Sequence, residues 1–358
     1  MIKTTQRIIL LFILSIFLVS WGNGGHYIIN NKSPESFPVS MNAFRVWTDS
    51  LSMNASAADI RKSSDPDEGI RHYIDLDNYD VFLSKGRIPQ TYDSVVNTYG
   101  LSFVKANGTL PWATLNTYDS LKLAFIQRRW NKAMLFASDL GHYVADGHMP
   151  LHLTANYDGQ LTNQKGIHSR YESTMVSTFI ADLRNYGSRT VNFVPNVNKY
   201  IFDYMYLNYK SLADILAADI YAKNLTESTS SSQYYAALWS KTQVITTTLF
   251  QKSSQALAEL IYTAWVESGS PAYKSQTGFF SSPSIGNGSS FFPNPTKGAV
   301  KMKDDNIYKT EILDLTGKIV GTFFEHHFDV SHLPNGMYLL NIYERKGGNK
   351  MEKVLLLK

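Results

Sequence analysis

Two pairs of potential metal ligands lie within one short stretch of the chain and constrain its fold more than any other feature. The ligands come in order as His142 with Asp146, then His152, then His168 with Glu172. Residues four apart on an α-helix point their side chains from one face toward a common point. An imidazole and a carboxylate so placed are ligands that zinc accepts. One such pair is common on exposed helices, but two pairs with a histidine between them predict a metal site.

Histidine usage supports the same interpretation. Three of the nine histidines lie in a C-terminal segment that looks separate: His326, His327 and His332. Five of the others stand in contexts typical of metal ligation: His26, His72, His142, His152 and His168. The last one, His148, lies two residues after Asp146 and off the face of the i,i+4 pair, so we assign it to ordinary packing.

The amino terminus has the pattern of a secretory signal over residues 1–20. A basic start precedes the apolar run Ile8–Val19, which is too short to span a bilayer comfortably. Cleavage after Ser20 would leave Trp21 as the first residue of the mature chain. The free α-amine and the carbonyl oxygen of that residue could then chelate a metal ion in a five-membered ring.

In this order, the residues resemble the zinc-dependent phospholipase C and single-strand-specific nuclease superfamily. Mature chains of that family begin with Trp followed shortly by His, and WGNGGH supplies Trp21 and His26 here. Two further ligand positions resemble Asp59 in ASAADIRK and His72 in RHYIDLD, and the remaining pattern falls on the two pairs and the histidine between them. The resemblance covers about residues 21–267 and implies a mainly α, multi-helix domain with three zinc ions in one cleft.

The resemblance also implies which residues hold each ion. Zinc one would take Asp59, His72, His142 and Asp146; zinc two would take His152, His168 and Glu172; zinc three would take the amine and carbonyl of Trp21, His26 and the bridging Asp146. Ions held in this way would activate a water molecule for attack on a phosphodiester. Asp59 would be the catalytic residue that orients this water. Lys62 occupies a position where the nucleases carry a basic residue near the phosphate.

The composition fits an exported enzyme. The 358 residues include no cysteine, so no thiolate competes for zinc and no disulfide stabilises the fold. A hydrophobic fraction of 44% is sufficient for one large core and a smaller domain. The formal net charge of +4 is too small to indicate nucleic-acid binding by itself. We expect a monomer.

Helical patterns dominate up to residue 267. Apolar spacing predicts one helix over Asp119–Ala145, which would present the first ligand pair; its apolar positions are Leu123, Ile126, Trp130, Met134, Leu135 and Ala137. A second amphipathic run over Gln233–Glu267 predicts a packing face, with Leu238, Ile245, Leu249, Leu260 and Trp265 as candidate core residues. Residues 156–166 are rich in turn formers and predict a loop between His152 and His168.

The composition changes where the helical patterns end. Residues 268–290 are rich in Ser, Gly and Pro and predict a flexible linker. Residues 291–358 show short alternating strands with turn signals, which predict a small all-β sandwich. The motifs PNP at 293–295, DLTGK at 314–318 and LPNGMY at 333–338 resemble the C-terminal sorting domain of the type IX secretion system. That resemblance implies export across the outer membrane, with the secretion machinery as partner; a carbohydrate-binding or adhesion domain is the alternative.

Three functions are compatible with these patterns. Glu172 and its HSRYE context resemble bacterial phospholipases, which hydrolyse phospholipid head groups. Tyr73 and Asp75 resemble the aromatic ring and carboxylate with which the nucleases stack and hydrogen-bond a base, so a single-strand-specific endonuclease or 3′-nucleotidase is the second function. A non-catalytic zinc-binding surface protein is the third function, and it would leave Asp59 without a role.

One residue bears on the head group that a phospholipase would prefer. Ile60 stands where a choline-binding phospholipase would offer an aromatic ring, which argues against a choline preference. We favour the phospholipase.

Overall fold

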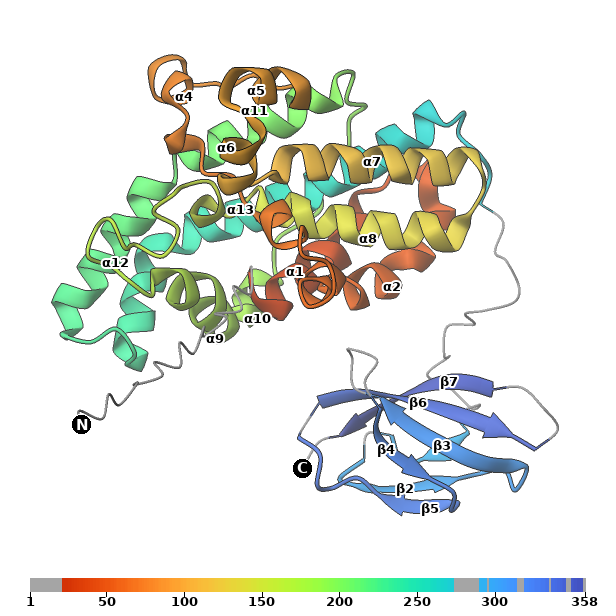
Figure 1. The fold of residues 1–358 in the computed structure, drawn as a ribbon. Helices are drawn as coiled ribbons and strands as arrows, with labels where there is room; N and C mark the ends of the chain where they lie inside the picture. Colours follow the sequence, from red (N-terminus) through yellow and green to blue (C-terminus); the bar gives the residue numbers. More distant parts are fainter. Residues whose placement is uncertain are drawn as a thin grey trace, which may run out of the picture. The chain divides into compact units, whose positions relative to one another are not determined.

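The computed structural model describes residues 21–273, 290–294, 296–313, 319–334, 336–345 and 349–356. The chain divides into two units, Met1–Lys274 and Ser275–Lys358, the first helical and the second built of strands (Figure 1). The predicted signal peptide, most of the predicted linker and the DLTGK motif lie outside the described residues. Within the described residues, no helix has both the length and the apolar character needed to cross a membrane.

The helical unit starts with short helices and continues with longer ones. The first part contains α1 (Gly22–Lys32), η1 (Ser33–Ser36), η2 (Val39–Trp47), α2 (Thr48–Met53), α3 (Ala57–Arg61), η3 (Gly69–His72), η4 (Leu76–Asn78), α4 (Asp80–Lys85), α5 (Tyr92–Tyr99) and α6 (Leu101–Ala106). The second part contains α7 (Leu110–Ile126), α8 (Trp130–Asp146), η5 (Pro150–His152), η6 (Ser169–Met175), α9 (Val176–Thr178), α10 (Ile180–Leu183), α11 (Val197–Tyr209), α12 (Leu212–Thr226) and α13 (Ser232–Glu267). Most η elements are 3-10 helices, whereas η6 is a π-helix.

The single helix predicted over residues 119–145 is wrong, because α7 and α8 are separate helices that pack against each other (Figure 1). The Arg129 N–H bonds to the Ala124 carbonyl at 2.9 Å and the Arg128 N–H bonds to the Phe125 carbonyl at 3.0 Å. These two bonds form a Schellman motif, with Arg128 in the left-handed position at φ 54°. The change of direction exposes three residues that the single helix placed on its apolar face: Leu123, Ile126 and Leu135.

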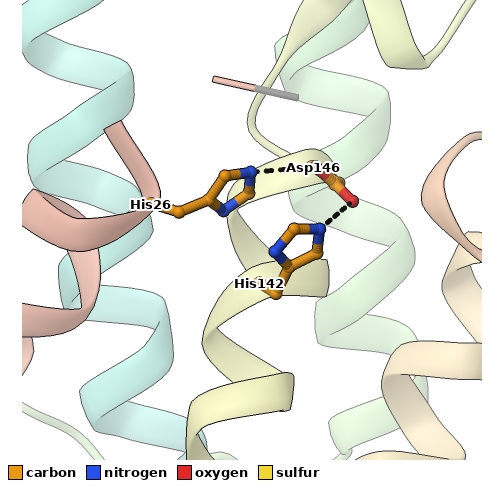
Figure 2. A group of neighbouring side chains, drawn as sticks. All are labelled: His26, His142 and Asp146. Atoms are coloured by element: carbon orange, nitrogen blue, oxygen red, sulfur yellow. Dashed lines mark ion pairs between the residues drawn. The ribbon is translucent and has the colours of Figure 1, made fainter. Parts of the chain in front are cut away.

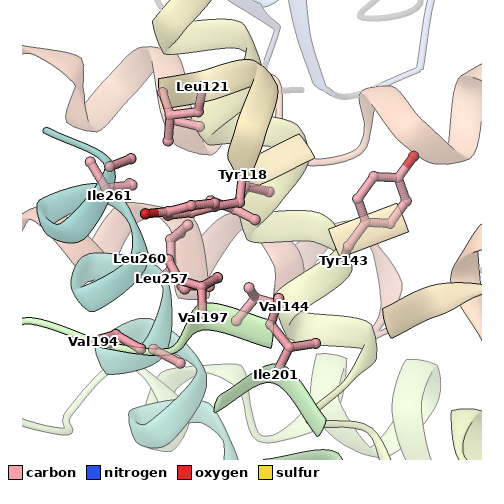
Figure 3. Close-up of a cluster of buried hydrophobic side chains, with 14 of the residues drawn as sticks. Tyr118, Leu121, Tyr143, Val144, Val194, Val197, Ile201, Leu257, Leu260 and Ile261 are labelled. Atoms are coloured by element: carbon pink, nitrogen blue, oxygen red, sulfur yellow. The ribbon is translucent and has the colours of Figure 1, made fainter. Parts of the chain in front are cut away.

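Helix α13 contributes to both hydrophobic clusters of the helical unit. Leu238 and Leu249 pack in a cluster with residues of α1, η6 and α12, whereas Leu260 and Trp265 pack in a cluster with residues of α7, α8 and α11. Figure 3 shows part of the second cluster, where α13 meets α7, α8 and α11: Tyr118, Val144, Ile201, Leu257, Leu260 and Ile261. The predicted packing face is confirmed, with Ile245 only partly buried.

The helical unit does not end with α13. Tyr273 packs against Phe44, Trp130 and Trp47, with ring centroids 5.2, 5.4 and 5.9 Å apart. The Trp265 indole N–H donates to the Pro271 carbonyl at 3.0 Å. Residues up to 273 therefore contact the helical core, although the sequence places them in the linker.

The second unit has two sheets whose neighbouring strands are antiparallel. Its strands are β1 (Phe291–Phe292), β2 (Ala299–Met302), β3 (Ile307–Leu313), β4 (Ile319–Phe323), β5 (His327–Asp329), β6 (Gly336–Glu344) and β7 (Asn349–Leu356). One sheet has the order β1-β2-β5 and the other β4-β3-β6-β7. Val300 and Phe328 of the first sheet share a hydrophobic core with Ile312 and Leu340 of the second. The fold is the predicted small sandwich.

Candidate metal centre

Helices α1 and α8 approach each other closely at the point where both carry histidines. The approach requires Gly141, because a Cβ atom there would lie 2.0 Å from Asn30 Oδ1. The Asn30 amide donates to the carbonyls of Leu51 and Ser138, both at 3.1 Å. This buried polar link ties α1 to the end of α2 and to α8. It fixes the helices that carry the first donor residues.

The first donor group consists of His26, His142 and Asp146, all fully buried (Figure 2). The rings of His26 and His142 stack, with centroids 3.9 Å apart and planes 7° apart. His26 Nε2 lies 3.6 Å from Asp146 Oδ1, and His142 Nε2 lies 3.4 Å from Asp146 Oδ2. The two carboxylate oxygens therefore face different histidines, the arrangement that a bridging ligand requires.

The second donor group consists of Asp59, His72 and His142. Asp59 Oδ1 lies 3.6 Å from both His72 Nδ1 and His142 Nε2. These two nitrogens are 3.0 Å apart, and His72 Nδ1 is also 3.0 Å from Asp146 Oδ2. The four residues that the resemblance assigns to zinc one thus lie together, and His142 belongs to two donor groups.

The third donor group consists of His152, His168 and Glu172. His152 Nε2 lies 3.3 Å from Glu172 Oε2, and His168 Nε2 lies 2.8 Å from Glu172 Oε1. Glu172 lies on the π-helix η6, whose i→i+5 hydrogen bonds make a wider turn than an α-helix. Residues four apart still lie on nearly the same side of a π-helical turn, so His168 and Glu172 converge as predicted. The sequence did not indicate that the helix would be of the π type.

Three histidines are held so that Nε2 faces the donor groups. The Nδ1 atoms of His142, His152 and His168 lie 2.7, 2.6 and 3.1 Å from the carbonyl oxygens of Ala55, His72 and Tyr157, respectively. An Nδ1–H donated to a carbonyl leaves the lone pair of Nε2 for a metal ion. Within the described part of the chain, several buried ring nitrogens of the donor groups have no hydrogen-bond partner: both nitrogens of His26 and Nε2 of His72, His152 and His168. These donor atoms fit a bound cation.

Burial sets the charge of the donor residues. It lowers the pKa of His26 to about 3, with the nearby His142 adding to the effect, and it lowers the pKa of His142 to about 3 as well. Burial also opposes a charge on His152, but Asp146 and Glu172 outweigh it and raise the pKa to about 9. Burial would raise the pKa of Asp146, yet the charges of His142 and His152 hold it well below its usual range. Two imidazoles are therefore neutral near neutral pH, as zinc binding requires.

Trp21 is fully buried next to the donor groups. Its ring packs edge-on against Phe250 with centroids 4.7 Å apart, and its indole N–H donates to the Ala145 carbonyl at 2.7 Å. Its main-chain N–H donates to Glu172 Oε2 at 3.2 Å. The main-chain nitrogen therefore contacts a carboxylate that the resemblance assigns to zinc two, whereas the resemblance assigns Trp21 itself to zinc three.

Glu68 is a buried carboxylate behind the donor groups that the sequence analysis missed. Its Oε1 lies 3.4 Å from His72 Nε2 and accepts a hydrogen bond from the Tyr143 hydroxyl. Its Oε2 lies 2.7 Å from Arg71 Nη1 and 3.3 Å from Arg61 Nε. Burial alone would raise the pKa of Glu68, but the nearby His72, the hydrogen bond from Tyr143 and the charge of Arg61 keep it below its usual value. The i,i+4 spacing from His72 is the one sequence signal that could have identified Glu68.

Asp59 and Lys62 form an ion pair at a more accessible edge of the centre. Lys62 Nζ lies 2.7 Å from Asp59 Oδ1, and the two side chains are 17% and 14% exposed. Asp59 Oδ2 has no hydrogen-bond partner among the residues that the structure describes. One oxygen of Asp59 is thus held by Lys62, whereas the other is buried and makes no hydrogen bond to the described residues.

The predicted substrate-binding residues Tyr73 and Asp75 are half-buried near the third donor group. Burial and a neighbouring carboxylate raise the pKa of Asp75 to about 7, whereas His152 opposes the shift. Burial raises the pKa of Tyr73, and Asp75 and Tyr157 add to the effect. Tyr157, which no sequence pattern marked as a site residue, has its ring 6.0 Å from that of His168. A carboxylate and two tyrosines therefore lie beside the donor groups.

Comparisons with known proteins identify the second unit most clearly. Residues 290–357 match the family model of the secretion system C-terminal sorting domain. This domain indicates export by type IX secretion, into the medium or to the cell surface, as the sequence predicted. A search of curated protein sequences finds no significant match.

The solved structures that match most of the chain include two alpha toxins from Clostridium. The alpha toxin from Clostridium absonum is 12% identical, with 94% of this chain and 97% of that chain covered and a TM-score of 0.45. The alpha-toxin of an avian strain of Clostridium perfringens is 10% identical, with 93% and 98% covered and a TM-score of 0.46. At such low identities and TM-scores, neither likeness carries evidence about activity.

Proposed function

We propose that the helical unit is a zinc-dependent phosphoric diester hydrolase that cleaves phospholipid head groups as a phospholipase C does. The observation that carries the proposal is the convergence of three His/carboxylate donor groups in one buried centre, two of which share His142. Neutral imidazoles and carboxylates are ligands that zinc prefers. The orphaned ring nitrogens of His26 support a bound cation as well.

We assign three zinc ions to this centre. The first would be held by Asp59, His72, His142 and Asp146, the second by His152, His168 and Glu172, and the third by the amine and carbonyl of Trp21 with His26 and Asp146. When bound, the ions would lower the pKa of a coordinated water and stabilise negative charge on the phosphoryl group. Buried ligands with fixed ring orientations would hold the ions without further ordering, which favours catalysis.

Asp59 has the geometry expected of the catalytic residue. Lys62 fixes its Oδ1, so Oδ2 is left to accept a hydrogen bond from the attacking water and to orient that water toward phosphorus. Lys62 would also contribute positive charge near the phosphoryl oxygens. The accessible edge formed by these two side chains is therefore the side from which substrate would enter.

The choice of a phospholipid substrate rests on the side chains beside the third donor group. Tyr73 and Asp75 flank Ile74, whose main-chain N–H bonds to the His152 carbonyl, and the Tyr157 ring lies 6.0 Å from that of His168. A carboxylate and two aromatic rings suit a head group carrying a cationic nitrogen. The nuclease is the second candidate, because a half-exposed Tyr73 next to Asp75 also suits a stacked and hydrogen-bonded base. The same two residues therefore decide between the substrates.

The proposal is tested by assaying one preparation on both substrate classes. The mature chain beginning at Trp21 would be loaded with zinc and given mixed phospholipid vesicles or single-stranded DNA and RNA. Release of phosphorylated head groups, with little nucleotide release, is the expected result. Asp75→Asn is the matched variant, because it should change the preference among head groups while leaving the zinc content unchanged. Cleavage of nucleic acid alone would establish the second candidate, and full activity after exhaustive chelation would refute both.

A further inference from the structure

His72 faces the donor groups with a different nitrogen from its neighbours. His142, His152 and His168 direct Nε2 to the centre and bond Nδ1 to main-chain carbonyls. His72 instead directs Nδ1 toward Asp146, at 3.0 Å, and its Nε2 faces the carboxylate of Glu68, at 3.4 Å. A carboxylate at the outer nitrogen fixes the tautomer and makes the imidazole a stronger electron donor than a carbonyl does.

Glu68 is itself held rigidly by three side chains. Its side chain is fully buried, and its two oxygens contact Tyr143, Arg71 and Arg61. A buried carboxylate with so many donors is fixed in one orientation and satisfied in charge. Glu68 can therefore act as a rigid support for His72.

The same network joins the helices that carry the other ligands of the first ion. Arg61 follows Asp59 on α3, and its guanidinium lies 2.9 Å from Asp139 Oδ2 and 3.3 Å from the Tyr143 hydroxyl on α8. Helix α8 also carries His142 and Asp146. The contacts of Glu68 and Arg61 thus link α3, η3 and α8 directly behind the second donor group.

We infer that Glu68 is a positioning residue that holds His72 in the orientation and tautomer required to ligate the first ion through Nδ1. The inference rests on the zinc centre proposed above and names a residue that supports it without touching substrate. The main-chain carbonyl of His72 also accepts from His152 Nδ1 at 2.6 Å, so this support extends to the third donor group.

The test compares two variants of the full mature chain, Glu68→Gln and Asp139→Asn. Glu68→Gln keeps the size of the side chain but removes its charge from His72, whereas Asp139→Asn weakens the anchor of Arg61 without touching His72. Zinc affinity would be measured by competition with a chromophoric chelator, and ligand geometry by the visible absorption of the Co²⁺-substituted protein. Thermal unfolding in excess chelator would report the stability of each metal-free variant.

Glu68→Gln should weaken one zinc ion about 10- to 100-fold, leave the other two unchanged and alter the cobalt spectrum. Asp139→Asn should lower the unfolding temperature of the metal-free protein but preserve zinc affinity and spectrum. Wild-type zinc affinity and spectrum in Glu68→Gln would overturn the inference, and so would equal zinc loss in both variants. In either case an active, zinc-loaded wild type leaves the proposed function intact. A wild type that binds no zinc would overturn the proposed function together with the inference.

Discussion

The imidazole rings of His26 and His142 lie face to face, with centroids 3.9 Å apart. They come from α1 and α8, helices that are far apart in the sequence and closely packed in the fold (Figure 2). Both rings contact Asp146, so the packing of two helices sets the distance between donor atoms of the first donor group. The site therefore depends on small residues between the helices as well as on the ligands.

Gly141→Ala should disrupt this packing. The added methyl group would lie 2.0 Å from Asn30 Oδ1 and 2.7 Å from Leu257 Cδ2, so α1 and α8 must separate or distort. Overpacking of this kind costs about 1–3 kcal/mol. We expect a lower free energy of unfolding and loss of the zinc ion whose proposed ligands include His26. Gly187→Ala is the control, since a Cβ there meets no atom within 4 Å; equal zinc content in both variants would contradict the prediction.

The stability of the metal-free protein should fall as pH decreases below about 6.5. The pKa values of His26 and His142 are about 3 in the fold and about 6.5 in the unfolded chain. Between these two pH values the unfolded chain therefore binds more protons than the native chain. The low pKa of Asp146 acts in the same direction, whereas His152, with a pKa of about 9 in the fold, opposes the trend near pH 6.5, where the unfolded imidazole loses its proton, and has no effect at lower pH. Urea unfolding in excess chelator between pH 4 and pH 7 checks the prediction. His26→Asn should reduce the change of the unfolding free energy with pH. An unchanged slope of that free energy against pH would show that His26 does not cause the loss of stability.

The donor pairs were predictable because their spacing is local, whereas their supports depend on the tertiary fold. His168 and Glu172 converge as expected from four-residue spacing, but nothing in SRYESTM signals a π-helix. Arg128 ends α7 in the left-handed conformation, which glycine usually adopts at the end of a helix. Because arginine stands at this position, nothing in the sequence indicated that the helix ends there. Glu68 is identified as a support only once Tyr143 and the arginines are seen around it.

Asp146→Asn and Glu172→Gln should differ in the number of ions that they release. Asp146 contacts His26 through Oδ1 and His72 through Oδ2, so its replacement should weaken two positions. Glu172 contacts His152 and His168, whose Nε2 atoms belong to one group, so its replacement should weaken one position. Metal analysis after mild dialysis measures the difference. Equal losses of a single ion in both variants would contradict the assignment of a bridging carboxylate.

Truncation should separate the catalytic unit from its export signal, provided that the cut comes after Tyr273. A chain ending at Glu267 loses the packing of that ring on Phe44, Trp47 and Trp130, at a cost of up to about 3 kcal/mol. A chain ending at Tyr273 should keep its zinc content, unfolding temperature and hydrolytic activity. Both should fail to reach the cell surface of their own host, which fractionation would show. Equal stability of the two chains would mean that Tyr273 adds nothing to the core.

A single residue added before Trp21 should weaken one zinc position and slow turnover while leaving the fold intact. Only a free α-amine has a lone pair for zinc, because the nitrogen of a peptide bond does not. Trp21 is fully buried and its main-chain nitrogen lies 3.2 Å from Glu172 Oε2, so a nitrogen with a free lone pair at this position would lie among the donor groups. The effect should resemble that of His26→Ala, which removes another ligand proposed for the same ion. Zinc content and rate would be compared between the authentic chain and a chain with an added Met. Identical values would show that Trp21 serves only as a packed aromatic side chain and that the third ion is held by other residues or is absent.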